Sequence, residues 1–408
     1  MAIGSGTLER ARHLRLVRPD EPVSVRTPAE ISARRTVYLL LGATAFLVVG
    51  GLIMVLSSSS VAAYAQYGDS FLFLQRQAAY AGVGVLALLL TSRMRYRAWQ
   101  RLAAPFLGLT VLLLLLVLHP AASVSAYGSS RWLVFGPVTI QPSEIAKLSL
   151  LIFVAAVLAR KWGRLDDLGH LALPLVPVAL AVCGLVMLQP DLGTTIILAG
   201  TTFLVLFAAG VRMRYLIATA VVGSAVGMAL IFSADYRRVR FLSFLDPWAD
   251  AKNTGYQLVQ SLIALGSGGF TGVGLGASRQ KWQYVPNAHT DFIFSILGEE
   301  LGLLGELAVL VAFGALVFAG IRVATRAPDV FGRLLAAGIV SWFGLQALVN
   351  LGAVTGLLPI TGVPLPFVSY GGSSLVVSLA AVGILWNIAR SPTAASSAAT
   401  GQRRRSAA

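Results

Sequence analysis

The residues best suited to chemistry are His289, Thr290 and Asp291, which close the longest polar interruption of the chain, 235–291, directly before an apolar run. A carboxylate where a polar loop meets such a run is costly unless something there needs it. Asp291 could take a proton from a hydroxyl nucleophile or relay it. The structural alternative is a helix N-cap, which the spacing alone favours.

Cationic side chains in the same interruption could hold an anion. Arg237 and Arg240 belong to the basic run 236–240, and Lys281 lies closer to Asp291 in the sequence. Guanidinium groups bind phosphate oxygens in pairs, so retention of a phosphate-bearing ligand is one interpretation. Attraction of the same run to lipid headgroups is the other.

A second polar stretch, 128–147, reads GSSRWLVFGPVTIQPSEIAK. Glu144 and Lys147 are three residues apart and therefore lie on one face of the helix that begins near Pro142. Together with Arg131 and Trp132 just upstream, this pair could hold a phosphate-bearing headgroup, with the Trp ring at the membrane interface. From spacing alone, a helix start with a local ion pair is the simpler interpretation.

Three further polar features have structural interpretations: an aspartate in a turn, an irregular segment and a group of glutamates. Asp191 follows a proline in a short turn and is predicted to be a helix N-cap. The segment 350–374 carries prolines and glycines at membrane depth, where irregular backbone must be buried in protein or line a polar cavity. Glu299, Glu300 and Glu306 are too acidic for contact with lipid, so we expect them to face the interior of the bundle.

The elements that position these residues are apolar helices. Hydrophobic residues make up 56% of the chain, charged residues 12%, and the mean hydropathy is +0.77. Ten runs come close to the roughly 20 residues that cross a bilayer. The sequence thus predicts an all-α polytopic membrane protein with about ten transmembrane helices in 36–390, one long extracytoplasmic loop at 235–291, and disordered tails at 1–35 and 391–408. The predicted spans are 36–56, 76–92, 102–119, 143–160, 170–188, 192–210, 215–233, 292–320, 333–354 and 371–390.

The basic residues predict the orientation. Most of the 32 Lys and Arg residues fall in one set of alternate loops and in both tails, which are therefore cytoplasmic, and 235–291 faces outward. The net charge of +15 then needs membrane lipids but no nucleic acid as a partner. Residues 256–270 have helical apolar spacing but are too few to span, so we expect this piece to lie along the membrane surface.

The sequence lacks the motifs typical of disulfide bonds, of ATP-driven transport and of metal sites. The single Cys183 excludes an internal disulfide and is expected to be a buried structural thiol. The chain has no GxxxxGK[ST] loop, which argues against an ATP-driven pump. No His/Cys cluster fixes a metal, so no cofactor is certain, although a divalent cation such as Mg²⁺ or Mn²⁺ could assist at a phosphate.

Four motifs together carry a family resemblance. They read YQLVQSLIALGSGGFTGVGLGASRQKWQYVPNAHTDFIFSILGEELGLLG, GSSRWLVFGPVTIQPSEIAK, QPDLGT and LLPITGVPLPFVSYGGSS. The chain resembles the SEDS family (FtsW/RodA/SpoVE) of bacterial peptidoglycan polymerases over about 36–390. The segment GLGASRQKWQYVPNAHTDFIFSILGEELG is most like the cell-division branch, FtsW, whereas PITGVPLPFVSYGGSS is closer to the elongation branch, RodA. Gln283 and Asn287 stand where FtsW sequences often carry Glu.

The resemblance implies a glycosyltransferase on the outer face of the cytoplasmic (inner) membrane. Such an enzyme polymerises lipid II, the undecaprenyl-diphosphate-linked disaccharide-pentapeptide, and releases undecaprenyl diphosphate. The FtsW likeness implies septal cell-wall synthesis in cell division. It also implies a class B penicillin-binding protein as partner, an FtsI-like transpeptidase, with other divisome proteins.

The resemblance also assigns residues. Asp291 matches the family's essential loop aspartate, and the motif at 128–147 matches an outer-loop motif. As a hypothesis, Asp291 deprotonates the acceptor hydroxyl while cations stabilise the departing diphosphate, a displacement that inverts the anomeric carbon. The expected substrate-binding residues are Arg131, Trp132, Glu144, Lys147, Arg237, Arg240, Lys281 and His289.

Three alternatives stay open from the sequence. A lipid II flippase would also suit ten spans with acidic groups and a segment broken by Pro and Gly, although it needs polar groups that continue across the bilayer. A noncatalytic scaffold would leave Asp291 without a chemical task. A RodA-type elongation polymerase would use the same chemistry with a different partner.

Overall fold

The structure is a computed structural model that describes residues 28–119, 123–126, 129–135, 138–164, 167–282, 284–286 and 288–391. Most of both predicted tails, and Gln283 and Asn287, lie outside these residues. The described helices are α1 (Pro28–Tyr67), α2 (Leu72–Arg93), α3 (Tyr96–Leu118), α4 (Pro142–Arg160), α5 (Leu168–Met187), α6 (Leu192–Ala208), α7 (Met213–Phe232), α8 (Asp235–Leu245), α9 (Tyr256–Gly268), α10 (Ile293–Arg326), α11 (Val330–Val354) and α12 (Gly372–Arg390).

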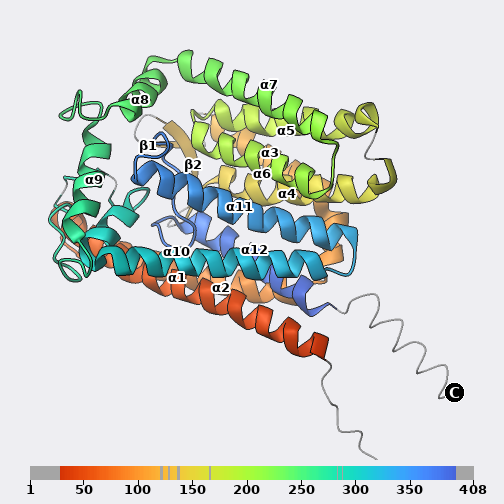
Figure 1. Cartoon of the computed structure of the whole chain (residues 1–408), viewed down its shortest axis with the longest axis horizontal. Helices are drawn as coiled ribbons and strands as arrows, with labels where there is room; N and C mark the ends of the chain where they lie inside the picture. The colour runs from red at the N-terminus through yellow and green to blue at the C-terminus, as the bar shows by residue number, and fades with distance from the viewer. Residues whose placement is uncertain are drawn as a thin grey trace, which may run out of the picture.

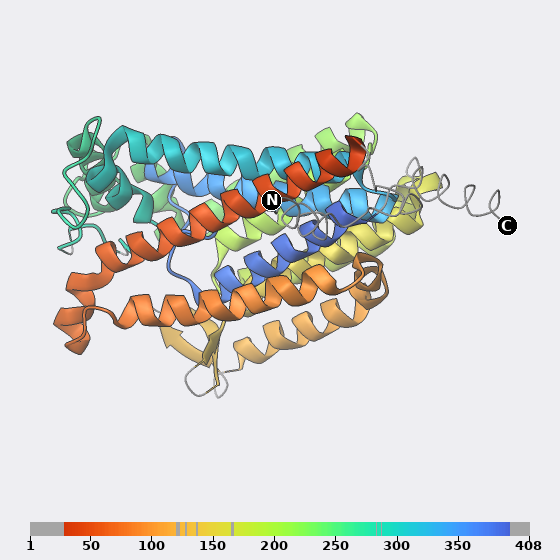
Figure 2. The same cartoon turned by 90° about the horizontal axis from the view of Figure 1, so that it is seen from below.

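The long helices run side by side in one bundle (Figure 1). The start of α1 and the end of α12 lie at one end of this bundle, and α8 and α9 lie at the other (Figures 1 and 2). Such an arrangement agrees with an even number of crossings. We call the end that carries α8 and α9 the loop end.

Every predicted span falls on a helix. Eight described helices are long and apolar enough to cross a membrane, and the spans predicted at 170–188 and 192–210 match shorter apolar helices, Ala172–Met187 and Leu192–Ala208. The multi-pass helical class is therefore confirmed, and a total of ten crossings stays a prediction. The boundary of the N-terminal tail needs correction, because α1 begins at Pro28: proline suits the first helical turn, and the following PAEISARR can extend the helix beyond its apolar part.

Burial differs sharply between helices. In α4, 83% of the apolar window is buried inside the protein, compared with 6% in α7. The interior position of α4 results from contacts with α3, α6 and α11, so its polar residues are removed from lipid. Helix α7 lies at the edge of the bundle, mainly against α6 and α8 (Figure 1).

A three-stranded antiparallel sheet between α3 and α4 was not predicted from the sequence. Strand β2 (Ser129–Phe135) pairs with β1 (Ser123–Ala126) on one side and β3 (Val138–Ile140) on the other. Its residues Arg131 to Phe135 alternate poorly between polar and apolar, which hides the strand in the pattern, although β-branched residues favour extended backbone. The sheet lies beside the bundle toward the loop end (Figure 2).

Helix α9 confirms the helix predicted at 256–270. It packs mainly against α10 and buries Leu258, Val259 and Ala264. Its axis crosses the loop end of the bundle instead of continuing along it (Figure 1). A helix of this length in this direction covers the end of α10 and cannot itself span.

Helix α10 is interrupted at Gly302, where φ is 64° and ψ is −166°. The glycine-rich turn after α9 enters this break and replaces the lost helical hydrogen bonds. Four backbone bonds join the two: Val273 N to Glu299 O at 3.0 Å, Gly274 N to Glu300 O at 3.0 Å, Leu303 N to Gly269 O at 2.9 Å, and Leu304 N to Phe270 O at 3.2 Å. The break therefore leaves few backbone groups unpaired in an apolar setting, as burial requires.

We predict that Gly302→Ala destabilises the protein by about 1–3 kcal/mol, because only glycine tolerates this backbone conformation. A Cβ there would also lie 2.7 Å from Phe270 O. Thermal unfolding in detergent measures the effect. Gly314→Ala on the same helix is the control, since a Cβ at Gly314 meets nothing within 4 Å. Equal melting temperatures for the two variants would contradict the prediction.

Candidate functional site

Asp291 lies just before α10 but does not cap it. The helix begins at Ile293, and its N-cap residue is Phe292, which makes no side-chain cap hydrogen bond. The carboxylate Oδ1 of Asp291 instead accepts from Thr290 Oγ1 at 2.8 Å. The N-cap interpretation is therefore wrong, and the carboxylate is left available for another task.

The surroundings of Asp291 favour its protonated form. Burial raises the pKa of this carboxyl, while the Thr290 hydroxyl and the positive charge of Arg240 act in the opposite direction. A carboxylate with a raised pKa binds a proton more strongly. Asp291 is thereby better suited to accept a proton from a hydroxyl than an exposed aspartate would be.

His289 packs in an aromatic cluster. Its ring centroid lies 5.0 Å from that of Phe73 and 5.5 Å from that of Tyr370, and its backbone oxygen accepts from Tyr370 N at 2.9 Å. Burial lowers the pKa of His289 to about 4. The imidazole is thus uncharged at neutral pH and adds no positive charge for a diphosphate.

Two side-chain amides of α11 fix the backbone around Asp291. Asn350 Nδ2 donates to the backbone oxygens of Asp291 and Val363, both at 2.8 Å. Gln346, one turn earlier, donates from Nε2 to Pro364 O at 2.8 Å. The sequence analysis missed both amides, although Asn and Gln inside an apolar helix are themselves a signal of interhelical hydrogen bonds.

The irregular segment between α11 and α12 reaches the same place. Val363, Leu365 and Phe367 are buried in the bundle, and a Cβ built on Gly362 would lie 3.8 Å from Asp291 Oδ2. Irregular backbone at membrane depth is accommodated here by burial and by amide donors. The segment predicted as a cavity wall is thus packed in protein along these residues and approaches the carboxylate at Gly362.

Glu144 and Lys147 form a buried ion pair on α4. Lys147 Nζ lies 2.8 Å from Glu144 Oε2, and the side chains are 2% and 3% exposed for Lys and Glu respectively. Lys147 Nζ also donates to Gln346 Oε1 at 2.9 Å, and Trp342 Nε1 donates to the same oxygen at 2.7 Å. The spacing argument for an ion pair is confirmed, and Gln346 connects this pair to the backbone that surrounds Asp291.

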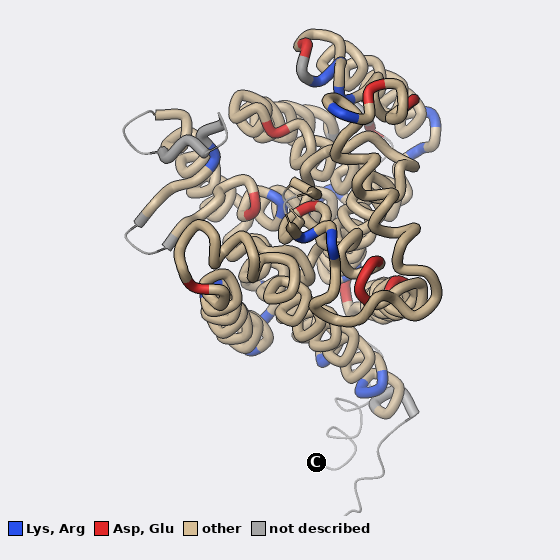
Figure 3. The backbone as a smooth tube through the Cα atoms, turned by 90° about the vertical axis from the view of Figure 1, so that its left-hand side faces the viewer, with Lys and Arg blue, Asp and Glu red and all other residues tan. Residues whose placement is uncertain are grey.

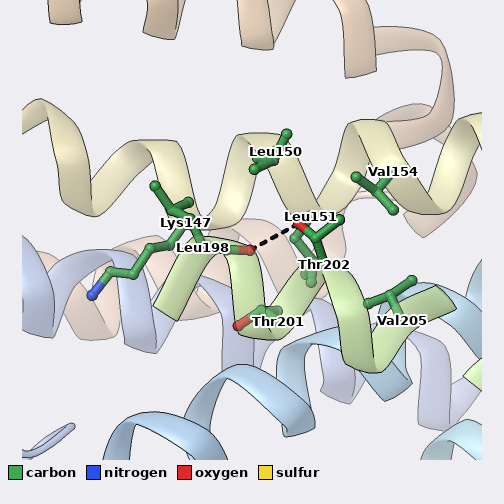
Figure 4. Close-up of a pocket in the computed structure, with 8 residues that line it drawn as sticks. All are labelled: Lys147, Leu150, Leu151, Val154, Leu198, Thr201, Thr202 and Val205. Carbon is green, nitrogen blue, oxygen red and sulfur yellow. Dashed lines mark hydrogen bonds between the residues drawn. The ribbon is translucent and has the colours of Figure 1, made fainter. Parts of the chain in front are cut away.

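The aliphatic part of Lys147 borders a small cavity between α4 and α6 (Figure 4). The volume is about 10 Å³, so it holds at most about one water molecule. Thr201 Oγ1 lies beside it without a hydrogen-bond partner among the described residues, and the Lys147 amine points away from it (Figure 4). The cavity is too small to be a substrate site.

Arg131 ties the sheet to the turn between α5 and α6. Its Nε donates to Gln189 O at 3.0 Å, its Nη2 donates to Pro190 O at 2.6 Å, and its Nη1 lies 3.9 Å from Asp191 Oδ2. Asp191 caps α6 as predicted, accepting from Thr194 N at 3.0 Å. The guanidinium of Arg131 is thus engaged in holding two segments together. Trp132, next to it in β2, is partly buried and pairs with Val124.

Glu299 and Glu300 are buried, as expected, and anchor the segment 276–281. Glu299 accepts from the Ser278 hydroxyl and from the backbone N of Arg279 at 3.0 Å. Glu300 accepts from the Ser57 hydroxyl at 2.6 Å and lies 3.8 Å from Lys281 Nζ. Lys281 also donates to Gly276 O, so its amine stabilises the loop. Glu306 is only partly buried.

The remaining predicted cations lie on α8 at the loop end. Arg240 is exposed, and its charge acts on Asp291. Arg237 donates from Nη2 to Ser233 Oγ at 3.2 Å. Figure 3 looks onto this end, where acidic and basic residues lie close together near the centre. Among the described residues, no group of three His, Cys, Asp or Glu side chains could hold a metal ion.

Comparison with known proteins gives the family. Residues 37–394 match the model of the FtsW/RodA/SpoVE family, described as cell cycle protein. The chain is 46% identical to the probable peptidoglycan glycosyltransferase FtsW of Geobacter metallireducens (83% of this chain, 90% of the relative) and 42% identical to the stage V sporulation protein E of Bacillus subtilis (86% and 96%).

Comparison with solved structures supports the same family. The fold resembles a chain from work on the structural coordination of polymerization and crosslinking by a peptidoglycan synthase complex, with a TM-score of 0.71, 32% identity, and coverage of 86% of this chain and 96% of that chain. It also resembles the rod shape determining protein RodA of Thermus thermophilus, with a TM-score of 0.63, 31% identity and coverage of 86% and 96%. The protein belongs to the FtsW/RodA/SpoVE family and is most like FtsW.

Proposed function

We propose that this protein is a peptidoglycan glycosyltransferase that polymerises lipid II into glycan strands, with Asp291 as the general base. The observation that carries the residue assignment is a partly buried carboxylate that caps no helix and whose pKa is raised by desolvation. The reaction class is supported by the relatives named as probable peptidoglycan glycosyltransferases.

The reaction places specific demands on the site. The 4-hydroxyl of one sugar attacks the anomeric carbon of the next, a new C–O bond forms, the bond to the diphosphate oxygen breaks, and undecaprenyl diphosphate leaves. Asp291 takes the hydroxyl proton, because a hydroxyl is a poor nucleophile without a base. Displacement in one step inverts the anomeric carbon.

The departing diphosphate needs positive charge. Arg240 is a candidate for this charge, because it is exposed on α8 and its positive charge favours the ionised form of Asp291. Arg131, Lys147 and Lys281 hold other parts of the protein and serve mainly to position the site. Mg²⁺ or Mn²⁺ could add charge at the diphosphate, but the described residues offer it no ligand cluster, and the steps above do not require it.

We further propose that the loop end faces outward, that both termini are cytoplasmic, and that the protein works at the division septum with other divisome proteins. The basic tails and inner loops support this orientation. The greater likeness to FtsW supports the septal role over elongation.

Replacing Asp291 with Asn should abolish glycan polymerisation by purified protein supplied with lipid II, because an amide cannot accept the hydroxyl proton. Melting temperature and yield in detergent should change little, because the carboxylate caps no helix. Gel analysis of the glycan product measures activity. The activity of the wild-type protein should also fall as pH decreases through the raised pKa of Asp291, since only the deprotonated carboxylate is a base. A near-wild-type amount of glycan from Asp291→Asn would contradict the assignment of Asp291 as the general base.

Lys147→Ala should destabilise the protein by about 3–5 kcal/mol, because it leaves Glu144 buried without its counter-ion. The double variant Lys147→Met, Glu144→Gln should recover much of this stability, which melting in detergent tests. If Lys147→Ala melts like the wild type but loses activity, the amine acts on substrate and the positioning role is incorrect.

Polymerisation should rise when a full-length class B penicillin-binding protein, the cognate crosslinking partner, is reconstituted with this chain. The resemblance to a chain of a synthase complex that coordinates polymerization with crosslinking supports such a partner, and linking the two sites raises the local concentration of strand at the transpeptidase. A partner without its membrane helix is the control and should not stimulate. A flat rate of lipid II consumption, with binding of the partner verified, would contradict the prediction.

A further inference from the structure

An open hollow of about 720 Å³ lies between α9 and the loop residues 279–282 and 284, apart from the side chains that surround Asp291. Its size is within the range of small-molecule sites. Its lining combines aromatic, amide and cationic side chains: Gln260, Ile263, Arg279, Gln280, Trp282 and Tyr284.

Two aromatic side chains of this lining are exposed. Trp282 is 61% exposed and Tyr284 is 55% exposed, although both lie on a loop that packs against buried residues. Aromatic rings combine a large apolar face with a polar group, which suits them to binding surfaces. A pyranose ring presents a face of C–H groups that packs on an aromatic ring, while its hydroxyl and N-acetyl groups point sideways to polar partners. The hollow offers both kinds of contact.

The polar lining selects among ligands. The side-chain amide of Gln280 lines the hollow, and amide groups exchange hydrogen bonds with the N–H and C=O groups of a ligand. Arg279 is exposed and makes no ion pair with a described residue. An N-acetylated sugar supplies the amide N–H, and a carboxylate on the same polymer would pair with the guanidinium.

The buried carboxylate of Glu299 anchors the loop that carries these groups. Glu299 accepts from the backbone N of Arg279 at 3.0 Å and of Gln280 at 3.3 Å. Trp282 N then donates to Arg279 O at 3.2 Å. An anchored turn keeps the aromatic and cationic groups in place before a ligand arrives, which reduces the entropy lost on binding.

The hollow is also close to the site of chain growth. Tyr284 precedes Asp291 by seven residues in the sequence, so the two are at most about 25 Å apart, the length of a few linked sugars. Helix α9 and the start of α10, which follows Asp291, lie at the loop end (Figure 1). A polymer leaving Asp291 could reach the hollow without leaving the protein.

We propose that this hollow binds the growing glycan strand, an N-acetylated hexosamine polymer that carries carboxylates, and keeps it on the enzyme between additions. The proposal rests on the polymerase function above. Two other roles compete: Trp282 and Tyr284 could be interfacial anchors in lipid headgroups, or a contact for a partner protein.

Binding is tested on full-length Asp291→Asn protein in detergent, where no turnover occurs. The probe is the tetrasaccharide of two GlcNAc–MurNAc-pentapeptide units, whose peptides carry the carboxylates of the nascent strand, and binding is followed by calorimetry. Trp282→Ala should weaken its affinity about tenfold, the worth of one stacked ring, and Trp282→Tyr should retain most of it. Arg279→Gln should weaken binding of this tetrasaccharide but not of chitotetraose, which lacks carboxylates. Trp248→Ala is the matched control, since Trp248 is 60% exposed and lies outside the hollow.

Equal affinities for Trp282→Ala and Trp248→Ala, or no binding by the parent, would overturn the proposal. So would quenching of Trp282 fluorescence by brominated lipids in nanodiscs, which would place the ring in the membrane. Loss of partner stimulation in Trp282→Ala with unchanged saccharide affinity would assign the surface to the partner instead.

Product length gives a second test with Asp291 intact. At matched consumption of lipid II, Trp282→Ala should yield shorter strands than Trp248→Ala, because strands dissociate earlier. Equal lengths would contradict strand retention. If the wild-type protein makes no glycan at all, the polymerase function fails on its own, and the binding measurements on Asp291→Asn still decide whether the hollow takes the saccharide.

Discussion

The structure depends on one constraint: irregular backbone inside an apolar bundle must have its polar groups paired. Two such segments meet at Asp291, the turn that leads into α10 and the stretch between α11 and α12. Asn350 donates to the backbone of both the Asp291 turn and the second stretch, at Asp291 O and Val363 O. The position of the carboxylate is therefore set by an amide inside a neighbouring helix. Loss of that amide would leave two buried carbonyls unpaired, a penalty comparable to that of a core mutation.

The same requirement separates structural acids from the chemically available one. Glu144 has Lys147 as its counter-ion, and Glu299 accepts several hydrogen bonds from the turn after α9. These carboxylates are engaged by a counter-ion or by backbone donors, so their chemistry is largely committed to holding the fold. The Asp291 side chain accepts a hydrogen bond from the Thr290 hydroxyl, and burial raises its pKa. A titratable group in such a setting is a candidate for function on physical grounds.

The sequence alone predicts those parts of the fold and the site that depend on residues close together in the chain. Hydrophobic runs predicted the helices, the spacing of Glu144 and Lys147 predicted their ion pair, and a proline followed by an aspartate predicted the cap at Asp191. The misses depend on distant partners. The N-cap interpretation of Asp291 was wrong because the helix begins two residues later, and the amides of α11 gain meaning only once the segment at Val363 is beside them. The interruption at Gly302 is set by the turn after α9, which no helical periodicity reveals.

The two ends of the bundle differ in a way that bears on transport. At the end opposite the loop end, Asp329 accepts from the Tyr96 hydroxyl at 2.7 Å and from Arg97 Nε at 2.8 Å. Asn387 accepts from Tyr96 N at 2.9 Å and donates to Ser92 O at 2.7 Å. These bonds join the α2–α3 turn, the α10–α11 turn and the last helix across that end. A transporter must open each end in turn, whereas a polymerase needs access at one end alone. The bonded end, set against a loop end with short helices and an open hollow, therefore fits polymerisation better than a flippase.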